Sequence, residues 1–256
     1  MGVRRGTLGL PAIRRAGRRV SAGIGVIILA GGFGTRLQPL LGDVPKPLAP
    51  VAGRPFLEYI LERLGRQGYR HVVLAAGHGA EQLQSHVGDG GRWGLEIEYS
   101  IEPQPLGTAG ALRLATDGRD SPRWLVLNGD SLVDVPLGEL VTAHASHGAR
   151  ASLALVRVDD TARYGAVELG QDGAIASFSE KNAAGGPGLI NGGVYVLERE
   201  VPEGVPEAAF VSLERDVLPG LVGRGLYGVD YGDALFIDIG VPDDYRRAQV
   251  LLAEAG

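Results

Sequence analysis

The stretch VIILAGGFGTRL, residues 26–37, decides the fold class of this sequence. Its first five residues form an unbroken apolar run, which two glycines end. Such a run is typical of a parallel strand that is buried on both faces. The glycines allow a tight turn in which several backbone N–H groups point at one spot, which suits phosphate oxygens. The stretch therefore predicts a buried first strand followed by an anion-binding loop.

Helix-like and strand-like segments alternate over the first half of the chain. From Arg54 to Gln67 the apolar residues recur at helical spacing, with the charged residues mostly on the other face. We expect further helices at Glu81–Val87, Thr108–Ala115 and Leu137–His147, and strands at His71–Ala75, Leu95–Ser100 and Trp124–Asn128. This alternation predicts a parallel sheet with helices on both faces.

The second half has several strands with only turns between them. We expect strands at Ala151–Val158, Ala166–Leu169, Ala174–Ser179, Gly192–Leu197, Leu226–Val229 and Leu235–Ile239, a hairpin turn at 171–173, and helices at Leu213–Val222 and Asp243–Ala253. This half is expected to extend the same sheet. The fold class is therefore α/β: a Rossmann-like mixed, mostly parallel sheet flanked by helices.

Composition limits the classes of function. The chain has 256 residues, no cysteine and a formal net charge of -5, which disfavours general binding to nucleic acid or anionic membranes. The absence of cysteine excludes disulfides, thiol catalysis and cysteine zinc sites, and it fits a cytoplasmic location. No apolar run is long enough to span a membrane.

The first 23 residues differ in composition from the rest. They contain six arginines and no acidic residue, and their apolar run is too short and broken for a signal peptide. We expect residues 1–23 to be a disordered basic arm and residues 24–256 to be a single catalytic domain.

Three charged side chains stand where phosphate chemistry could use them. Lys46 lies between two prolines, which restrict the backbone on both sides of it. Asp130 follows a predicted buried strand, and Asp238 ends a short one. Carboxylates at that edge of an α/β sheet can hold Mg²⁺. Taken singly, the lysine could be an exposed loop residue and each aspartate a turn or cap residue.

The glycine loop alone identifies no function. It does not match the P-loop pattern, and a dinucleotide fingerprint would need Gly or Ala at Leu37. Two histidines, His144 and His147, lie three apart on a predicted helix, where we expect an exposed polar face rather than a metal site. We expect His78 to be a loop residue.

Several motifs together resemble one family. Residues 32–36 (GFGTR), a spacer and then residues 45–47 (PKP) resemble the signature of the sugar nucleotidyltransferases. The resemblance continues from about residue 25 to the end of the chain, through residues 106–110 (LGTAG), 128–130 (NGD), 164–165 (YG), 180–181 (EK), 190–195 (INGGVY) and 236–240 (FIDIG). It implies the nucleotide-diphospho-sugar transferase fold and transfer of a nucleotidyl group from a nucleoside triphosphate to a sugar 1-phosphate.

The resemblance also implies roles for individual residues. Catalysis would fall to Arg36, Lys46, Asp130 and Lys181, and Mg²⁺ would bind Asp130 and Asp238. The sugar side would contain Gly165, Glu180, Lys181 and Asn191. The nucleotide side would contain Ala30, Gly31, Gly32, Gly34, Thr35, Arg36, Lys46, Glu102, Gly107 and Thr108. At Gly107 and Thr108, we expect free N–H groups of an opening helix to attract an anion or a base carbonyl.

The substrate is less narrowly defined. Residues 43–50, 53–59 and 128–131 most resemble D-glycero-D-manno-heptose 1-phosphate guanylyltransferases, so we expect GTP, with Glu102 reading the guanine. Mannose 1-phosphate guanylyltransferase and N-acetylmuramate 1-phosphate uridylyltransferase remain alternatives. So does a catalytically dead regulatory subunit, although Arg36, Lys46, Asp130 and Asp238 are all present. Homo-oligomer formation is left open. Asn182 and Gly192 depart from the family pattern, which bears on the fit of the sugar.

Overall fold

The computed structural model describes residues 23–32, 34–164, 166–179 and 185–254. The predicted arm, apart from Gly23, lies outside the described residues. So do Gly165, Glu180 and Lys181, three of the predicted sugar-side residues.

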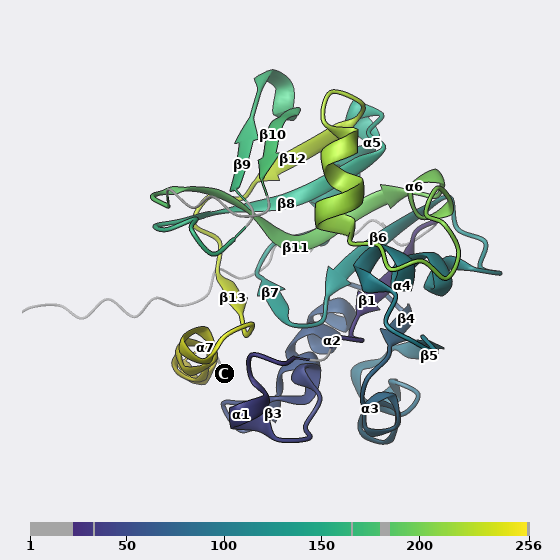
Figure 1. Cartoon of the computed structure of the whole chain (residues 1–256), viewed down its shortest axis with the longest axis vertical. Helices are drawn as coiled ribbons and strands as arrows, with labels where there is room; N and C mark the ends of the chain where they lie inside the picture. The colour runs from purple at the N-terminus through teal and green to yellow at the C-terminus, as the bar shows by residue number, and fades with distance from the viewer. Residues whose placement is uncertain (1–22, 33, 165, 180–184, 255–256) are drawn as a thin grey trace, which may run out of the picture.

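A nine-stranded sheet runs through the centre of the described structure (Figure 1). Four parallel strands make one half, in the order β5 (Glu96–Ile101), β4 (His71–Ala76), β1 (Gly25–Leu29) and β6 (Arg123–Asn128). The chain moves outward on one side of β1 and then returns to its other side at β6. Because Leu29 pairs with Asn128, the loops that follow β1 and β6 start side by side.

The second half extends this sheet, as the sequence predicts. Strand β11 (Gly188–Glu198) lies antiparallel to both β6 and β8 (Ala151–Val158). Beyond them lie β12 (Leu226–Asp230), which pairs with β8, and the hairpin of β9 (Ala166–Leu169) and β10 (Ile175–Ser179). The predicted mixed sheet is confirmed. One strand differs: β13 (Phe236–Asp238) pairs with β7 (Ser131–Val133) in a separate small sheet.

Helices cover both faces of the sheet. One hydrophobic layer joins the sheet to α2 (Phe56–Arg66), α3 (Ala80–Val87), α5 (Leu137–His147) and α7 (Pro242–Glu254). The other joins it to α4 (Gly107–Thr116) and α6 (Glu200–Glu203). Successive residues of β1 alternate between the layers, Ile28 packing in the first and Ile27 in the second. A strand buried on both faces therefore explains the continuous apolar run.

Short elements complete the described chain. They are α1 (Gln38–Leu41), η1 (Lys46–Leu48), β2 (Pro50–Val51), β3 (Arg54–Pro55), η2 (Gly91–Trp93) and η3 (Gln171–Gly173). The predicted regular helix at 213–222 is wrong: a π-helical turn, η4 (Leu213–Val217), meets a 3₁₀ turn, η5 (Leu218–Leu221). Pro219 explains the change, because proline lacks the N–H that an α-helix needs at that point.

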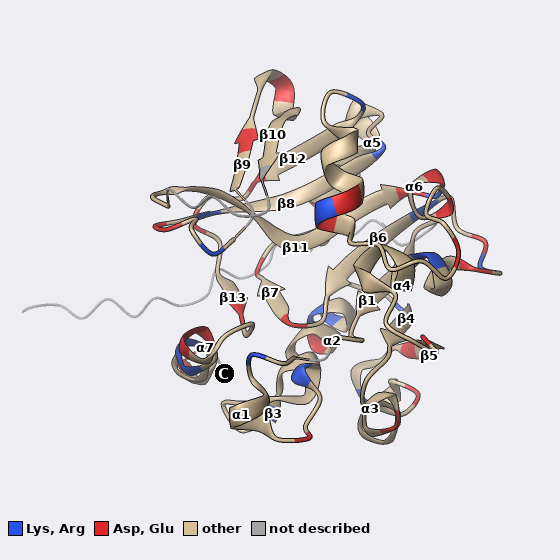
Figure 2. Ribbon diagram, viewed as in Figure 1, with Lys and Arg blue, Asp and Glu red and all other residues tan. Residues whose placement is uncertain are grey.

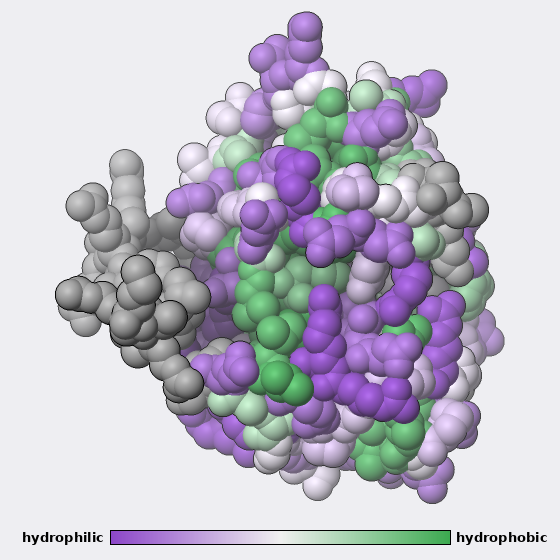
Figure 3. Space-filling model, turned by 90° about the vertical axis from the view of Figure 1, so that its left-hand side faces the viewer, coloured by the Kyte–Doolittle hydropathy of each residue, from purple (hydrophilic) through white to green (hydrophobic). Residues whose placement is uncertain are grey.

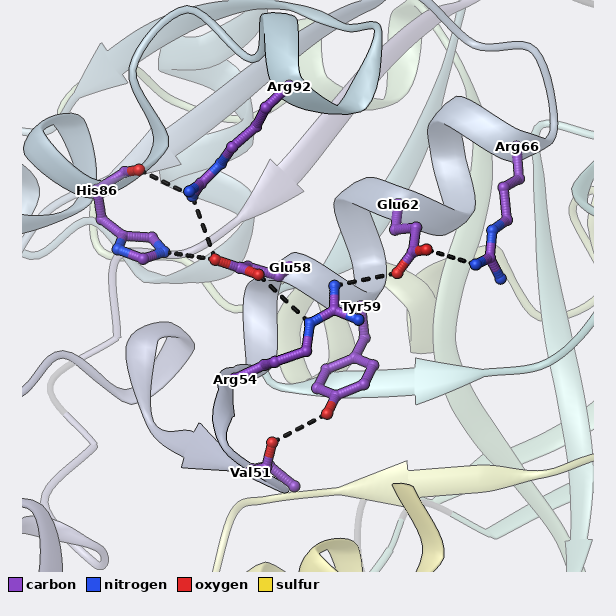
Figure 4. A network of polar contacts seen from close by, with 8 residues as sticks. All are labelled: Val51, Arg54, Glu58, Tyr59, Glu62, Arg66, His86 and Arg92. Atoms are coloured by element: carbon purple, nitrogen blue, oxygen red, sulfur yellow. Dashed lines mark hydrogen bonds and ion pairs between the residues drawn. The ribbon is translucent and has the colours of Figure 1, made fainter. Parts of the chain in front are cut away.

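A polar network ties the N-terminal helices together (Figure 4). Glu58 of α2 contacts Arg54, His86 of α3, and Arg92, with its Oε1 2.8 Å from His86 Nε2. Arg54 also binds Glu62. Individual exposed ion pairs contribute little, but a shared carboxylate holds α2, α3, β3 and η2 in one arrangement.

His144 is a correction to the sequence prediction. Its side chain is fully buried, whereas His147 is exposed and stacks on Tyr227. Ring Nδ1 of His144 lies 2.9 Å from Ser152 Oγ, and Nε2 lies 3.0 Å from Glu198. Both ring nitrogens have partners, so the polar ring can be buried. Burial lowers the pKa of His144, although Glu198 opposes the shift.

The surface is mixed in character. Figure 2 shows Lys and Arg near Asp and Glu on many elements rather than on separate faces. On the face seen in Figure 3, hydrophobic residues form a strip bordered by hydrophilic ones. Among the described residues, none of the helices combines the length and apolar character that crossing a membrane requires.

Candidate active site

The loops that follow β1 and β6 approach closely at one edge of the sheet. The N–H of Gly129 donates to the carbonyl of Leu29 at 2.8 Å. A Cβ at position 129 would lie 2.8 Å from that carbonyl oxygen, so a larger residue would force the loops apart. The glycine therefore brings the residues after β6 against the glycine-rich loop.

Lys46 and Asp130 meet at this edge. Lys46 Nζ lies 2.5 Å from Asp130 Oδ2, and the lysine side chain is only 13% exposed. Gly34 packs against the lysine: its φ is +59°, and a Cβ there would lie 3.0 Å from Lys46 Cβ. Glycine tolerates that backbone conformation and leaves room for the lysine stem.

Asp238 completes an acidic pair. Strand β13 pairs Asp238 with Ser131, whose Oγ lies 3.1 Å from Asp238 Oδ2 and 3.3 Å from Asp130 Oδ1. The N–H of Gly240 donates to Asp238 Oδ1 at 2.6 Å. Two segments more than a hundred residues apart thus place their carboxylates around one hydroxyl group.

The two carboxyl groups differ in electrostatic environment. Burial, and then the charge of Asp130, raise the pKa of Asp238. Burial acts in the same direction on Asp130, but the Lys46 ammonium group outweighs it and lowers the pKa of Asp130. Lys46, the Gly240 N–H and Ser131 therefore compensate the negative charge of Asp238 only in part.

This donor set fits a divalent cation that also binds substrate. Carboxylate oxygens are hard ligands, and Mg²⁺ is often held by one or two carboxylates together with substrate phosphates. In the described part of the chain, no group of three or more His, Asp or Glu could hold a metal. Asp130 and Asp238 therefore suit a metal ion that substrate phosphates also bind, rather than one held by protein ligands alone.

Glu102 lies beside the glycine loop, after β5. Its Oε2 accepts the N–H of Leu106 at 3.1 Å. Its Oε1 faces Gly31 and Gly77, where an added Cβ would lie 2.8 and 2.3 Å away. Burial raises the pKa of Glu102, and the hydrogen bond from Leu106 only partly opposes this. Two glycines thus create the space that this half-buried carboxylate occupies.

The start of α4 differs from expectation. The N–H groups of Ala109 and Gly110 donate to the carbonyl of Val211. The Thr108 hydroxyl donates to Glu214 at 2.8 Å and accepts from the N–H of Leu213 at 2.7 Å. Part of the expected anion-binding end is therefore occupied by the chain itself, because the segment at 209–214 packs across it. Nucleotide contacts by Gly107 and Thr108 stay a prediction.

Asn191 lies in an irregular part of β11. Hydrogen bonds through Tyr195 and Glu214 connect it to Thr108. Its Nδ2 donates to Tyr195 Oη at 2.8 Å, and its Oδ1 accepts from the N–H of Gly193 at 3.0 Å. Gly193 has a φ of +76°. A Cβ on Gly192 would lie 2.9 Å from Val133 Cγ2, which accounts for glycine at this departure from the family pattern.

Tyr164, next to the undescribed Gly165, packs near the acidic pair. Its hydroxyl donates to Asp244 at 3.2 Å, and its ring meets Phe236 of β13 edge-on. Burial raises the pKa of Tyr164 to about 12, so the hydroxyl stays protonated. Tyr164 therefore lies beside the strand that carries Asp238.

The glycine loop presents an accessible basic group. Gly32, Thr35 and Arg36 are exposed, whereas Ala30 is buried at the end of β1. Arg36 forms no ion pair with another described residue. A small pocket here is lined in part by Gly34, Lys46 and His78. Arg36 and the pocket suit an incoming phosphate.

The sequence and the structure resemble characterised proteins over most of the chain. The nucleotidyl transferase family matches residues 25–255. This chain belongs to that family. D-glycero-alpha-D-manno-heptose 1-phosphate guanylyltransferase of Aneurinibacillus thermoaerophilus is 39% identical over 225 residues, which are 87% of this chain and 96% of that protein. Among solved structures, HddC from Yersinia pseudotuberculosis has a TM-score of 0.78 and 32% identity, covering 90% of this chain and 99% of the other.

Another similar nucleotidyl transferase is longer. Mannose-1-phosphate guanylyltransferase of Mycobacterium tuberculosis is 38% identical over 228 residues, 88% of this chain. The match covers 63% of that protein, so this chain spans less than two thirds of its length. HddC has also been solved in complex with GMP-PN.

Sequence reasoning about this nucleotidyl transferase gave no role to three polar residues of the site: Ser131 and Tyr195, which lie within the quoted motifs, and Glu214. A tyrosine within an apolar strand is a usable signal, because a buried hydroxyl needs a partner. Glu214 gave no such signal, because Ser212 followed by acidic residues is also typical of an ordinary helix start. Its role depends on contacts between distant segments.

Proposed function

We propose that this chain transfers a nucleotidyl group from a nucleoside triphosphate to a sugar 1-phosphate and releases pyrophosphate. The meeting of Lys46, Asp130 and Asp238 beside the glycine loop, in a member of the nucleotidyl transferase family, carries the proposal. Residues 24–256 would act as one catalytic domain. A regulatory subunit without catalytic activity would not need these three groups, so their proximity favours an active enzyme.

The reaction needs positioning and charge rather than a covalent intermediate. A phosphate oxygen of the sugar 1-phosphate attacks the α-phosphorus in line. The new phosphorus–oxygen bond forms while the α–β bridging bond breaks, and pyrophosphate leaves. Lys46 would face the α-phosphate, Arg36 and the loop N–H groups the leaving phosphates, and Lys181 the attacking phosphate. Gly165, Glu180 and Asn191 would contact the sugar.

Enzymes of this family generally use a divalent metal. We assign Mg²⁺ to Asp130 and Asp238, where it would supply positive charge to the substrate phosphates. Lys46 would release Asp130 in part, because its ammonium group can bond to a phosphate oxygen instead.

GTP and a D-glycero-D-manno-heptose 1-phosphate are the proposed substrates. The support is the 39% identity to an enzyme named for that acceptor, over nearly the whole of both proteins. Glu102 supplies a physical candidate for reading the base. One carboxylate can accept from the adjacent N1–H and N2–H of guanine, whereas uracil offers one N–H between two carbonyl oxygens.

Mannose 1-phosphate is the second candidate acceptor. An identity of 38% to a mannose-1-phosphate guanylyltransferase supports it, although the match covers only 63% of that protein. Both candidates share GTP, so the base and the sugar need separate tests.

A panel of triphosphates and sugar 1-phosphates, assayed for pyrophosphate release, tests the proposal. We expect kcat/KM for GTP to exceed that for UTP by about ten- to a hundredfold, and Glu102→Gln to reduce this preference. Glu96→Gln changes an exposed carboxylate on β5, the strand that leads to Glu102, and is the matched control. A wild-type preference for UTP would exclude the guanylyltransferase assignment. A GTP preference unchanged in Glu102→Gln would exclude only the role of Glu102.

A further inference from the structure

A buried tyrosine connects the two predicted halves of the site. Tyr195 is fully buried, and its hydroxyl contacts Asn191, Asn128 and Glu214. Asn191 belongs to the predicted sugar side, and Asn128 lies two residues before Asp130. The hydroxyl donates to Glu214 Oε1 at 3.0 Å and accepts from Asn191 at 2.8 Å.

Glu214 extends these contacts to the nucleotide side. Its Oε2 accepts from the hydroxyls of Thr108, at 2.8 Å, and Ser212, at 3.2 Å. Thr108 then accepts the N–H of Leu213. The Glu214 carboxylate therefore joins two series of hydrogen bonds, one that leads to α4 and one that leads to β11.

The chemistry of a carboxylate fixes the direction of these bonds. An ionised carboxylate only accepts, so all three hydroxyl protons must point at Glu214. The lone pairs of Tyr195 then face Asn191 and bind one proton of its amide. The second amide proton of Asn191 is then held in a fixed direction, in which it could donate to a sugar hydroxyl. Burial raises the pKa of Tyr195 well above its usual value, which keeps this proton in place.

We infer that Glu214 is a positioning residue that sets Asn191 for the sugar 1-phosphate and the start of α4 for the nucleotide. This inference rests on the proposed function for the identity of the two ligands. Glu214 itself would touch neither substrate. It would act through Tyr195 on one side and through Thr108 on the other.

Glu214→Gln is the first test, because glutamine has one acceptor oxygen where glutamate has two. At least one hydroxyl must then turn its proton away. We expect KM for both substrates to rise about tenfold, because the side that faces the amide nitrogen loses its acceptor and the other side loses a charge-assisted hydrogen bond, with a smaller change in kcat. Tyr195→Phe should raise KM for the sugar 1-phosphate alone, leaving KM for GTP within about twofold.

The double variant and a control separate positioning from simple loosening of the turn. In Glu214→Gln/Tyr195→Phe, KM for the sugar 1-phosphate should be no higher than in Tyr195→Phe, because both changes break the same chain of bonds. Asp216→Asn makes the same chemical change in the same turn, where Asp216 accepts only the N–H of Ser212 in the described contacts. It should leave both KM values within about twofold. Additive effects, or an equal effect of Asp216→Asn, would overturn the inference.

The side-chain amide resonances of Asn191 give a readout that needs no activity. They can be assigned by their loss in Asn191→Ser. Both Glu214→Gln and Tyr195→Phe should shift them, and Asp216→Asn should not. Unshifted resonances in Glu214→Gln would overturn the positioning role even in an active enzyme. A wild type that releases no pyrophosphate would instead refute the proposed function, and the resonances would still decide the role of Glu214.

Discussion

Two carboxylates share one lysine at the centre of the site, and they share it unequally. Asp130 contacts Lys46 directly, whereas Asp238 receives bonds from the Ser131 hydroxyl and the Gly240 N–H. Because burial and Asp130 raise the pKa of Asp238, its charge is costly in the folded protein. That cost makes sense if a cation joins the pair when substrate binds. Asp238 therefore lowers the stability of the folded protein while it provides a ligand for the proposed metal.

Replacing Asp238 should separate these two effects. Asp238→Asn removes a charge that the transition state needs, so we expect kcat to fall at least about a hundredfold at saturating Mg²⁺. The same change relieves repulsion, so Tm should stay unchanged or rise. Kinetics and thermal unfolding check both results. Asp243→Asn, at an exposed carboxylate nearby, is the control. Near wild-type rates in Asp238→Asn would exclude its metal role.

Arg36 and Lys181 should act on opposite substrates. Arg36→Ala should weaken use of the triphosphate, and Lys181→Ala should mainly weaken use of the sugar 1-phosphate. Each lost charge-assisted contact should cost on the order of 2–4 kcal/mol of transition-state stabilisation. Steady-state kinetics with each substrate varied in turn would reveal the split. Equal effects of both variants on both substrates would contradict these assignments.

Sequence reasoning predicted the residue types of the centre better than their bonds. The positions of Asp130 and Asp238 at strand ends already suggested that they meet. The bonds of Thr108 and Asn191 could not be predicted, because Glu214 and Tyr195 join segments that are distant in the chain. Hydrogen bonds of this kind follow from tertiary packing, which no local pattern contains.

At the scale of elements, His144 connects α5 to β8 and β11 through Ser152 and Glu198. Its lowered pKa means that the folded protein favours the neutral ring. The unfolded chain therefore binds the proton more readily, with a pKa of about 6.5. The stability contribution is complete above that pH and is lost as the pH falls toward the folded pKa.

The variant His144→Gln should reduce this acid sensitivity. Unfolding by urea at pH 7.5 and pH 5.5 gives the loss of stability on acidification for each protein. We expect a smaller loss in His144→Gln than in the wild type, although the variant is less stable at pH 7.5. His71→Gln, at an exposed histidine, should behave like the wild type. An unchanged loss in His144→Gln would show that this ring does not govern the acid response.

Periodicity in the sequence predicted most of the long helices and strands, and the exceptions have identifiable physical causes. The apolar run of β1 and the helical face of α2 were strong signals. The segment at 213–222 was not a regular helix, since Pro219 lacks the N–H that an α-helix needs there. The burial of His144 was missed although the residue continues the helical face of Leu137, Leu140 and Val141, because its partners Ser152 and Glu198 come from distant strands. Tertiary partners decided that case.

At the scale of the whole molecule, the family match begins at residue 25, after the arginine-rich stretch. We therefore expect a chain starting at Gly23 to keep the melting temperature and kcat/KM of the full chain. Differential scanning calorimetry and kinetics on both proteins would check this. A marked loss of either quantity would show that residues 1–22 contribute to the folded enzyme.

The fate of the α-phosphate tests the central claim most directly. Purified enzyme would be incubated with Mg²⁺, D-glycero-α-D-manno-heptose 1-phosphate and GTP labelled at its α-phosphorus, and the products separated. If this chain is a guanylyltransferase, the label will appear in a GDP-sugar, in amounts equal to the unlabelled pyrophosphate released. Label recovered only in GTP, GDP or GMP, with no nucleotide sugar formed from this or any other sugar 1-phosphate, would contradict this assignment.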